Sequence, residues 1–176
     1  MLRNADIAMY RAKERGRNAF EFFLPEMHQR AVRRLHLETA LRGALDRGEL
    51  LLHYQPKVAL ATDEVTGFEA LLRWRHPELG LVSPAEFIPI LEDTDLIAPV
   101  GEWVLREACR QVARWAADGF EPRPVAVNLS ARQFRMANFD RVVSRTLRQT
   151  GIDPALLELE LTESLLMQDP EETVRM

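Results

Sequence analysis

The stretch Val65-Thr66-Gly67-Phe68-Glu69-Ala70-Leu71-Leu72-Arg73-Trp74-Arg75 decides the fold, because two kinds of side chain alternate along it. Successive side chains of a β-strand point to opposite faces. One face would collect the apolar residues Phe68, Ala70, Leu72 and Trp74. The other would carry Gly67, Glu69, Leu71 and Arg73. We therefore expect a strand at 65–75 with one apolar face and one face that bears a carboxylate and a guanidinium.

Three further segments alternate in the same way and are expected to be strands. They lie at 50–60, 124–130 and 156–162. Their polar faces bear Gln55, Asn128 and the pair Glu158 and Glu160. The short link at 61–64 makes the first strand and the 65–75 strand a candidate hairpin. Polar side chains therefore recur on one face of four successive strands.

Helical patterns separate the later strands. Ser83-Pro84-Ala85-Glu86 predicts a helix start, with Ser83 as N-cap, Pro84 at the first helical position and Glu86 completing a capping box. Further helices are expected at 97–118 and 138–150, each closed by a glycine. A last helix start follows at 169–172. Strands that alternate with helices predict a parallel α/β architecture.

The polar face has two interpretations, and the alternation alone leaves both open. An antiparallel sheet with one solvated face is common. The intervening helices instead favour a parallel sheet whose polar face points into a barrel, where charges must be paired or bound to metal. Glu69, Asn128 and Glu160 are oxygen donors without a His/Cys cluster, which suits Mg²⁺ or Mn²⁺ and phosphoryl chemistry. Arg73 could grip a phosphate or pair with Glu69 or Glu158.

Composition excludes some functions. The 176 residues are 47% hydrophobic with a net charge of −4, so the broad basic footprint of a nucleic-acid-binding protein is absent. No apolar run approaches the roughly 20 residues of a membrane span, although a parent protein could carry an anchor elsewhere. The single cysteine, Cys109, falls in an expected helix and is interpreted as a core residue, which suits a reducing cytoplasm.

Five short motifs follow one another along the chain: Gln55-Pro56-Lys57-Val58, Gly67-Phe68-Glu69-Ala70-Leu71-Leu72-Arg73-Trp74, Pro84-Ala85-Glu86-Phe87-Ile88-Pro89, Asn128-Leu129-Ser130 and Glu160-Leu161-Thr162-Glu163. In this order and at this spacing, they resemble the EAL domain of bacterial cyclic-di-GMP signalling enzymes. The resemblance covers about residues 35–176. It implies a TIM-like (β/α) barrel with an antiparallel first strand, of which this chain holds about four of eight strands.

The resemblance also implies roles for single residues. Such domains linearise cyclic di-GMP to pGpG with Mg²⁺ or Mn²⁺ and commonly form homodimers. Glu69, Asn128 and Glu160 would be metal ligands, and Glu163 would hold the loop that shapes the metal site and the dimer contact. Gln55, Leu72 and Arg73 would contact the dinucleotide.

Residues 1–24 resemble the end of a GGDEF domain, the diguanylate cyclase type. A helix around 7–12 and a strand at 18–23 are expected there. Lys13 and Arg17 match positions that contact GTP phosphates in that family, but we expect them to be solvated and inert here. Residues 25–34 would be a linker helix, part of a helix expected at 26–46, and 35–176 the first half of the EAL domain.

The family's second half brings a paired Asp-Asp-Phe-Gly motif, a catalytic lysine, a further metal-binding glutamate and a glutamine, and this chain ends before those positions. A two-metal site needs ligands on both sides of the attacking water. We therefore expect little or no activity of this chain by itself. The alternatives are a regulatory module that binds cyclic di-GMP without cleaving it, and a non-functional gene fragment.

Overall fold

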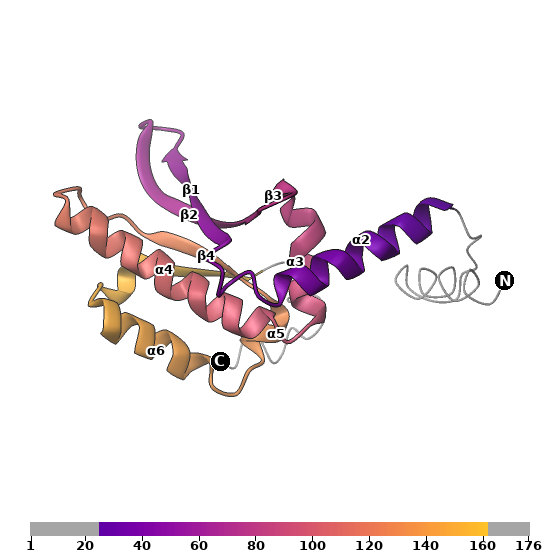
Figure 1. Cartoon of the computed structure of the whole chain (residues 1–176). Helices are drawn as coiled ribbons and strands as arrows, with labels where there is room; N and C mark the ends of the chain where they lie inside the picture. Colours follow the sequence, from indigo (N-terminus) through magenta and orange to yellow (C-terminus); the bar gives the residue numbers. More distant parts are fainter. Residues whose placement is uncertain (1–24, 162–176) are drawn as a thin grey trace, which may run out of the picture. The chain divides into compact units, whose positions relative to one another are not determined.

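The computed structural model describes residues 25–161, which Figure 1 draws in colour. The chain divides into two compact units, residues 1–43 and residues 44–176. The described part of the first unit is helix α2 (Pro25–Leu41) with the start of the turn that follows. The elements expected before residue 25, the helix start at 169–172 and Glu163 lie outside the described residues.

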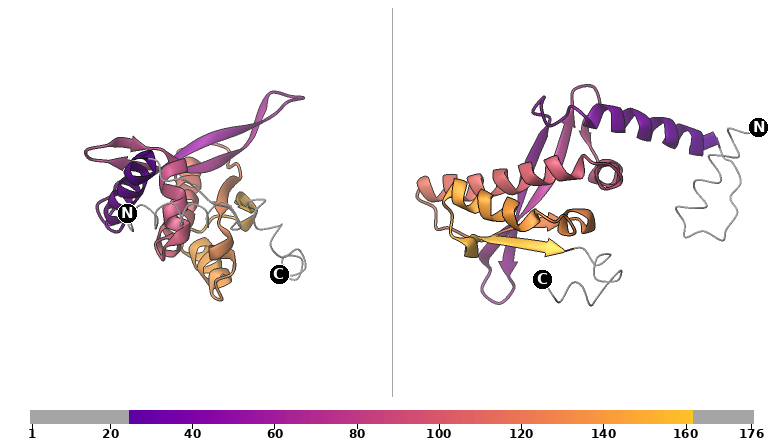
Figure 2. Two further views of the ribbon diagram at one scale, coloured as in Figure 1. Left: turned by 90° about the vertical axis from the view of Figure 1, so that its right-hand side faces the viewer. Right: turned by 90° about the horizontal axis from the view of Figure 1, so that it is seen from below.

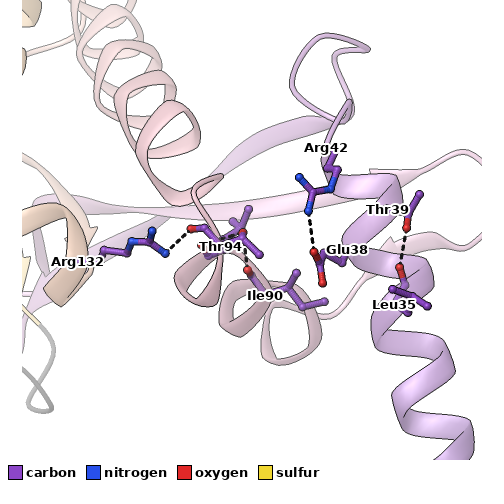
Figure 3. Close-up of polar contacts among 8 residues, drawn as sticks. Leu35, Glu38, Thr39, Arg42, Ile90, Thr94 and Arg132 are labelled. Atoms are coloured by element: carbon purple, nitrogen blue, oxygen red, sulfur yellow. Dashed lines mark hydrogen bonds and ion pairs between the residues drawn. The ribbon is translucent and has the colours of Figure 1, made fainter.

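Helix α2 is shorter than the helix expected at 26–46. It ends at Leu41, and the next seven residues form turns. The N–H of Gly43 donates to the carbonyl three residues back at 3.4 Å, and glycine is a poor helix former because its backbone loses much freedom on folding. In the last turn Arg42 pairs with Glu38 at 2.9 Å (Figure 3).

The second unit is built on a five-stranded sheet. Its spatial order is β1-β2-β4-β5, and the short β3 pairs with β2. β1 and β2 are antiparallel, whereas β2, β4 and β5 run parallel, as the hairpin and the intervening helices predicted. β3 was not predicted, because three residues are too few for an alternating pattern. The strands are β1 (Leu50–Ala59), β2 (Glu64–His76), β3 (Gly80–Val82), β4 (Val125–Leu129) and β5 (Leu157–Leu161).

Helices pack on the apolar face of this sheet, with α4 along the strands and α6 beside α4 (Figures 1 and 2). The Trp115 ring of α4 lies 5.0 Å from the Tyr54 ring and 4.8 Å from the Phe68 ring, measured between centroids. Cys109 is buried in α4 as expected, and burial raises the pKa of its thiol to about 11. The helices are α3 (Pro84–Asp93), α4 (Ile97–Ala117), α5 (Ala131–Phe134) and α6 (Phe139–Thr150).

The capping box expected at the start of α3, between Ser83 and Glu86, does not form. Ser83 is the N-cap of α3 and Pro84 opens the helix, but the Ser83 side chain makes no capping hydrogen bond. The N–H of Glu86 donates to the backbone carbonyl of Ser83 at 2.9 Å, so the donor that a capping box uses is already engaged. A capping box forms instead at α5, between Ser130 and Gln133.

A search of residues 25–161 finds no helix with the length and apolar character needed to cross a membrane.

Candidate functional site

Four polar residues occupy the face of the sheet opposite the helices. Gln55 on β1 pairs in register with Glu69 on β2, and Glu69 pairs with Ala126 on β4. Asn128 lies two residues further along β4, hence on the same face, and pairs with Glu160 on β5. The register therefore brings Gln55, Glu69, Asn128 and Glu160 to one face, as the alternation predicted.

Glu69 and Asn128 are in direct contact. The Asn128 Nδ2 donates to the Glu69 Oε1 at 2.7 Å, which links residues 59 positions apart in the chain. This bond uses the amide nitrogen of Asn128, so the carbonyl oxygen, which is the atom that can ligate a cation, lies outside the contact. The hydrogen bond fixes the two side chains next to each other on the polar face.

Lys57 on β1 contacts Glu160 on β5, at the other end of the strand order. Its Nζ donates to the Glu160 Oε1 at 2.6 Å and to the Glu158 Oε2 at 3.0 Å. The hydrogen bonds to Glu160 and then to Glu158 raise the pKa of the Lys57 ammonium above its usual value. One cation of the chain itself thus offsets part of the negative charge of the two β5 carboxylates. The sequence interpretation missed this role, although Lys57 lies two residues after Gln55 and therefore on the same face.

The Lys57 side chain crosses two strands to reach β5, a span of about 14 Å in a flat sheet. Its neighbour in register on β2 is Gly67, and the β4 residue that pairs with Glu158 is Ala126. Both are small and buried, although they lie on the polar face. Because the Lys57 and Glu160 side chains still meet across this span, the sheet must curve toward its polar face.

A cavity of about 280 Å³ opens at the carboxyl ends of β2 and β4, the strand ends where α/β folds bind ligands. Leu72, Arg73 and Asn128 line it. The Arg73 Nη1 donates to the Leu72 carbonyl at 2.9 Å, and among the described residues Arg73 pairs with neither Glu69 nor Glu158. Leu72, Arg73 and Asn128 therefore share one cavity, whose lining also includes apolar side chains of α3 and α4 such as Ile88 and Val104 and does not include Glu69 or Glu160.

The segment after Asn128 is braced at two points. The Ser130 hydroxyl donates to the Gln133 Oε1 at 2.9 Å and accepts the Gln133 N–H, and both residues are buried. Arg132 donates to the Thr94 carbonyl at 2.8 Å and pairs with Asp95, so α5 is tied to the loop between α3 and α4 (Figure 3). These contacts hold the end of β4, and thus Asn128, in place.

The donor set suits a hard divalent cation. Glu69 and Glu160 offer carboxylate oxygens and Asn128 an amide oxygen, the ligand types of Mg²⁺ and Mn²⁺. Residues 25–161 contain no group of three or more His, Cys, Asp or Glu side chains arranged to hold a metal ion. The described residues thus offer two carboxylates and one amide, and the remaining octahedral positions would go to water or substrate.

The family profile that matches this chain and the curated proteins most similar to it point to the same family. The profile of the EAL domain matches residues 38–176. The bifunctional diguanylate cyclase/cyclic di-GMP phosphodiesterase MucR of Pseudomonas aeruginosa is 48% identical over 166 residues, 94% of this chain. The cyclic di-GMP phosphodiesterase PdeR of Escherichia coli K12 is 44% identical over 171 residues, 97% of this chain. The chain spans about a quarter of these relatives, 24% of MucR and 26% of PdeR.

Solved structures share the fold. The PaMucR phosphodiesterase in complex with c-di-GMP has 46% identity and a TM-score of 0.76, over 80% of this chain and 57% of that one. The Xanthomonas citri FimX EAL domain in complex with c-diGMP has 26% identity and a TM-score of 0.67, over 80% of this chain and 54% of that one.

Proposed function

The chain belongs to the EAL domain family, and from that premise we propose that it is part of a phosphodiesterase that hydrolyses cyclic di-GMP to pGpG in bacterial signalling. The observation that carries the proposal is the register that places Glu69, Asn128 and Glu160 on one face of parallel strands. The names of two relatives, MucR and PdeR, support the substrate and the reaction.

Glu69, Asn128 and Glu160 would hold Mg²⁺ or Mn²⁺ in this proposal. When bound, such a cation activates water and stabilises charge in phosphoryl chemistry. Arg73 uses an N–H of its guanidinium on the Leu72 carbonyl and has further donors with which to grip a phosphate oxygen. With Leu72 in the same cavity and Gln55 on the same face as Glu69, these residues would position the dinucleotide.

The same proposal extends to parts of the chain beyond the described site. We take the curved sheet as the first part of a TIM-like barrel formed by 35–176, with 25–34 as a linker helix and 1–24 as the end of a GGDEF-type domain. The MucR match is longer than the EAL match, so it includes residues before 38. Glu163 would hold the loop beside the metal, the EAL domains would form a homodimer, and the protein would act in the cytoplasm.

The test is pGpG formation from cyclic di-GMP with Mn²⁺, measured for the 176-residue chain and for any longer form of the protein. We expect Glu69→Gln to lower the rate about a hundredfold or more in whichever form is active, because it removes a ligand charge. Glu64→Gln is the matched control, since Glu64 is exposed at the start of the same strand. Undiminished hydrolysis by Glu69→Gln would refute the assignment of the site.

A second candidate is a regulatory module that binds cyclic di-GMP without cleaving it. Within residues 25–161 no three His, Cys, Asp or Glu side chains are grouped so as to hold a metal ion, which favours it, as does the likeness to the ligand-bound FimX EAL domain. Calorimetry with cyclic di-GMP separates the two. Binding without pGpG in the presence of Mn²⁺ identifies the module, and turnover identifies the enzyme.

A further inference from the structure

The polar face of the sheet carries three carboxylates, and their like charges repel one another. Glu158 and Glu160 lie two residues apart on β5, and Glu69 lies two strands away on β2. Their side chains stay accessible to water, with 50% of the Glu158 and 39% of the Glu160 side chain exposed. A positive charge placed between these carboxylates lowers their mutual repulsion while no metal ion is bound to the face.

Lys57 supplies that charge over an unusual distance. It contacts Glu160 and Glu158 from a strand that pairs with neither, across the small residues Gly67 and Ala126. A Cβ at residue 67 would lie 2.9 Å from the Pro124 carbonyl oxygen, so the glycine is required by the close approach of the backbone as well. At residue 67, the packing of the backbone itself therefore keeps the path of Lys57 free of a side chain.

We propose that Lys57 is a tethered cation that occupies the Glu160 carboxylate in the metal-free protein and has to be displaced from it when a divalent cation binds. This inference rests on the proposed function, which makes Glu160 a metal ligand. The Glu160 Oε1, one of the two oxygens with which this carboxylate could ligate a metal, accepts a hydrogen bond from the Lys57 ammonium at 2.6 Å. The same ammonium already donates to Glu158 at 3.0 Å, so Lys57 keeps that partner on the face when it leaves Glu160.

Competition from the Lys57 ammonium lowers the affinity of the site for a divalent cation. Removing that ammonium should therefore raise the affinity. Lys57→Met keeps the length of the side chain and removes the charge, so we expect Mn²⁺ to bind about five- to tenfold more tightly, the effect of one charge contact at a partly exposed site. Lys57→Arg keeps the charge and should bind within about threefold of the parent chain. Arg148→Met, a charge removal in the last turn of α6, should leave binding unchanged.

Isothermal titration calorimetry with Mn²⁺ alone measures these affinities for the full chain, with circular dichroism to check that each variant is folded. Equal or weaker binding by Lys57→Met overturns the inference and leaves the proposed function intact, provided that the parent chain binds Mn²⁺ and Glu160→Gln does not. If neither the parent chain nor Lys57→Met binds Mn²⁺, the inference and the metal site of the proposed function both fail.

A direct readout exists because the chain has only two lysines, Lys13 and Lys57. In protein labelled with ¹⁵N-lysine, the Lys57 ammonium signal is identified by its loss in Lys57→Arg. We expect that signal to shift on titration with Mg²⁺, with the same midpoint as the calorimetric binding, because the contact with Glu160 is replaced by water while the contact with Glu158 remains. A Lys57 signal that stays unmoved while Mg²⁺ saturates the protein overturns the inference.

Discussion

Glu49, just before β1, shows how one carboxylate stabilises the edge of the second unit. Its Oε2 accepts the indole N–H of the fully buried Trp74 at 3.0 Å. Arg47 pairs with the same carboxylate, whose side chain is only 9% exposed. The hydrogen bond from Arg47 lowers the pKa of Glu49, burial opposes it, and the Trp74 N–H adds to the lowering. The carboxylate therefore stabilises the fold while it is ionised.

Replacing Glu49 should make this contribution visible. Glu49→Ala leaves the buried Trp74 N–H without its acceptor and should lower the free energy of unfolding by about 1–3 kcal/mol, whereas Glu49→Gln retains an acceptor and should cost less. Since the folded pKa is lowered, the stabilisation is present above the unfolded pKa near 4.5 and is lost as the pH falls through the folded pKa.

Urea unfolding at pH 7 and at pH 3 measures both effects. The parent chain should lose more stability between these pH values than Glu49→Gln does. An identical pH dependence of the two proteins would show that the Glu49 carboxylate contributes nothing of this kind.

At the scale of elements, the contact between α4 and α5 depends on one glycine. A Cβ on Gly101 would lie 1.6 Å from the Gln133 Nε2, and Gln133 is the buried partner of Ser130 in the capping box of α5. The side chain of Gln133 cannot stay where it is if residue 101 has a methyl group. Gly101 on α4 therefore leaves the space that the Gln133 side chain needs at the start of α5, a few residues after Asn128 in the chain.

Gly101→Ala should displace Gln133 and cost about 1–2 kcal/mol of stability, the usual value of a lost N-cap, despite the better helix propensity of alanine. Because the two residues are in contact, the effects of Gly101→Ala and Gln133→Ala should not add. Thermal unfolding of both single variants and the double variant checks this. Strict additivity in the double variant would rule out the close contact.

Helices and strands could be predicted from the sequence more reliably than single side-chain hydrogen bonds. The two possible capping boxes show the reason. Ser83 with Glu86 and Ser130 with Gln133 both match the spacing of a capping box, but it forms only at Ser130. At Ser83 the backbone carbonyl takes the Glu86 N–H, and this choice depends on the local backbone rather than on residue types. The alternation of side chains predicted β1 and β4 correctly, because a period of two depends only on neighbouring residues in the chain.

At the scale of the whole sheet, the polar face is made of residues far apart in the sequence. Glu69 meets Asn128 across 59 positions, and Lys57 meets Glu160 across 103. The alternation predicted that each strand has a polar face, but not which residues pair, because register and curvature depend on distant strands. Lys57 therefore went unassigned, whereas Glu69, Asn128 and Glu160 were predicted as a set. Glu163 stays a prediction, since it lies outside the described residues.

The central claim is that Glu69, Asn128 and Glu160 form one divalent-metal site, and crystals of the protein grown with Mn²⁺ test it most directly. An anomalous difference map at the manganese edge should show a peak about 2.0–2.6 Å from the carboxylate oxygens of Glu69 and Glu160 and the amide oxygen of Asn128. A map without that peak, in which Asn128 still donates to Glu69 and Lys57 still holds Glu160 at saturating Mn²⁺, would contradict the account.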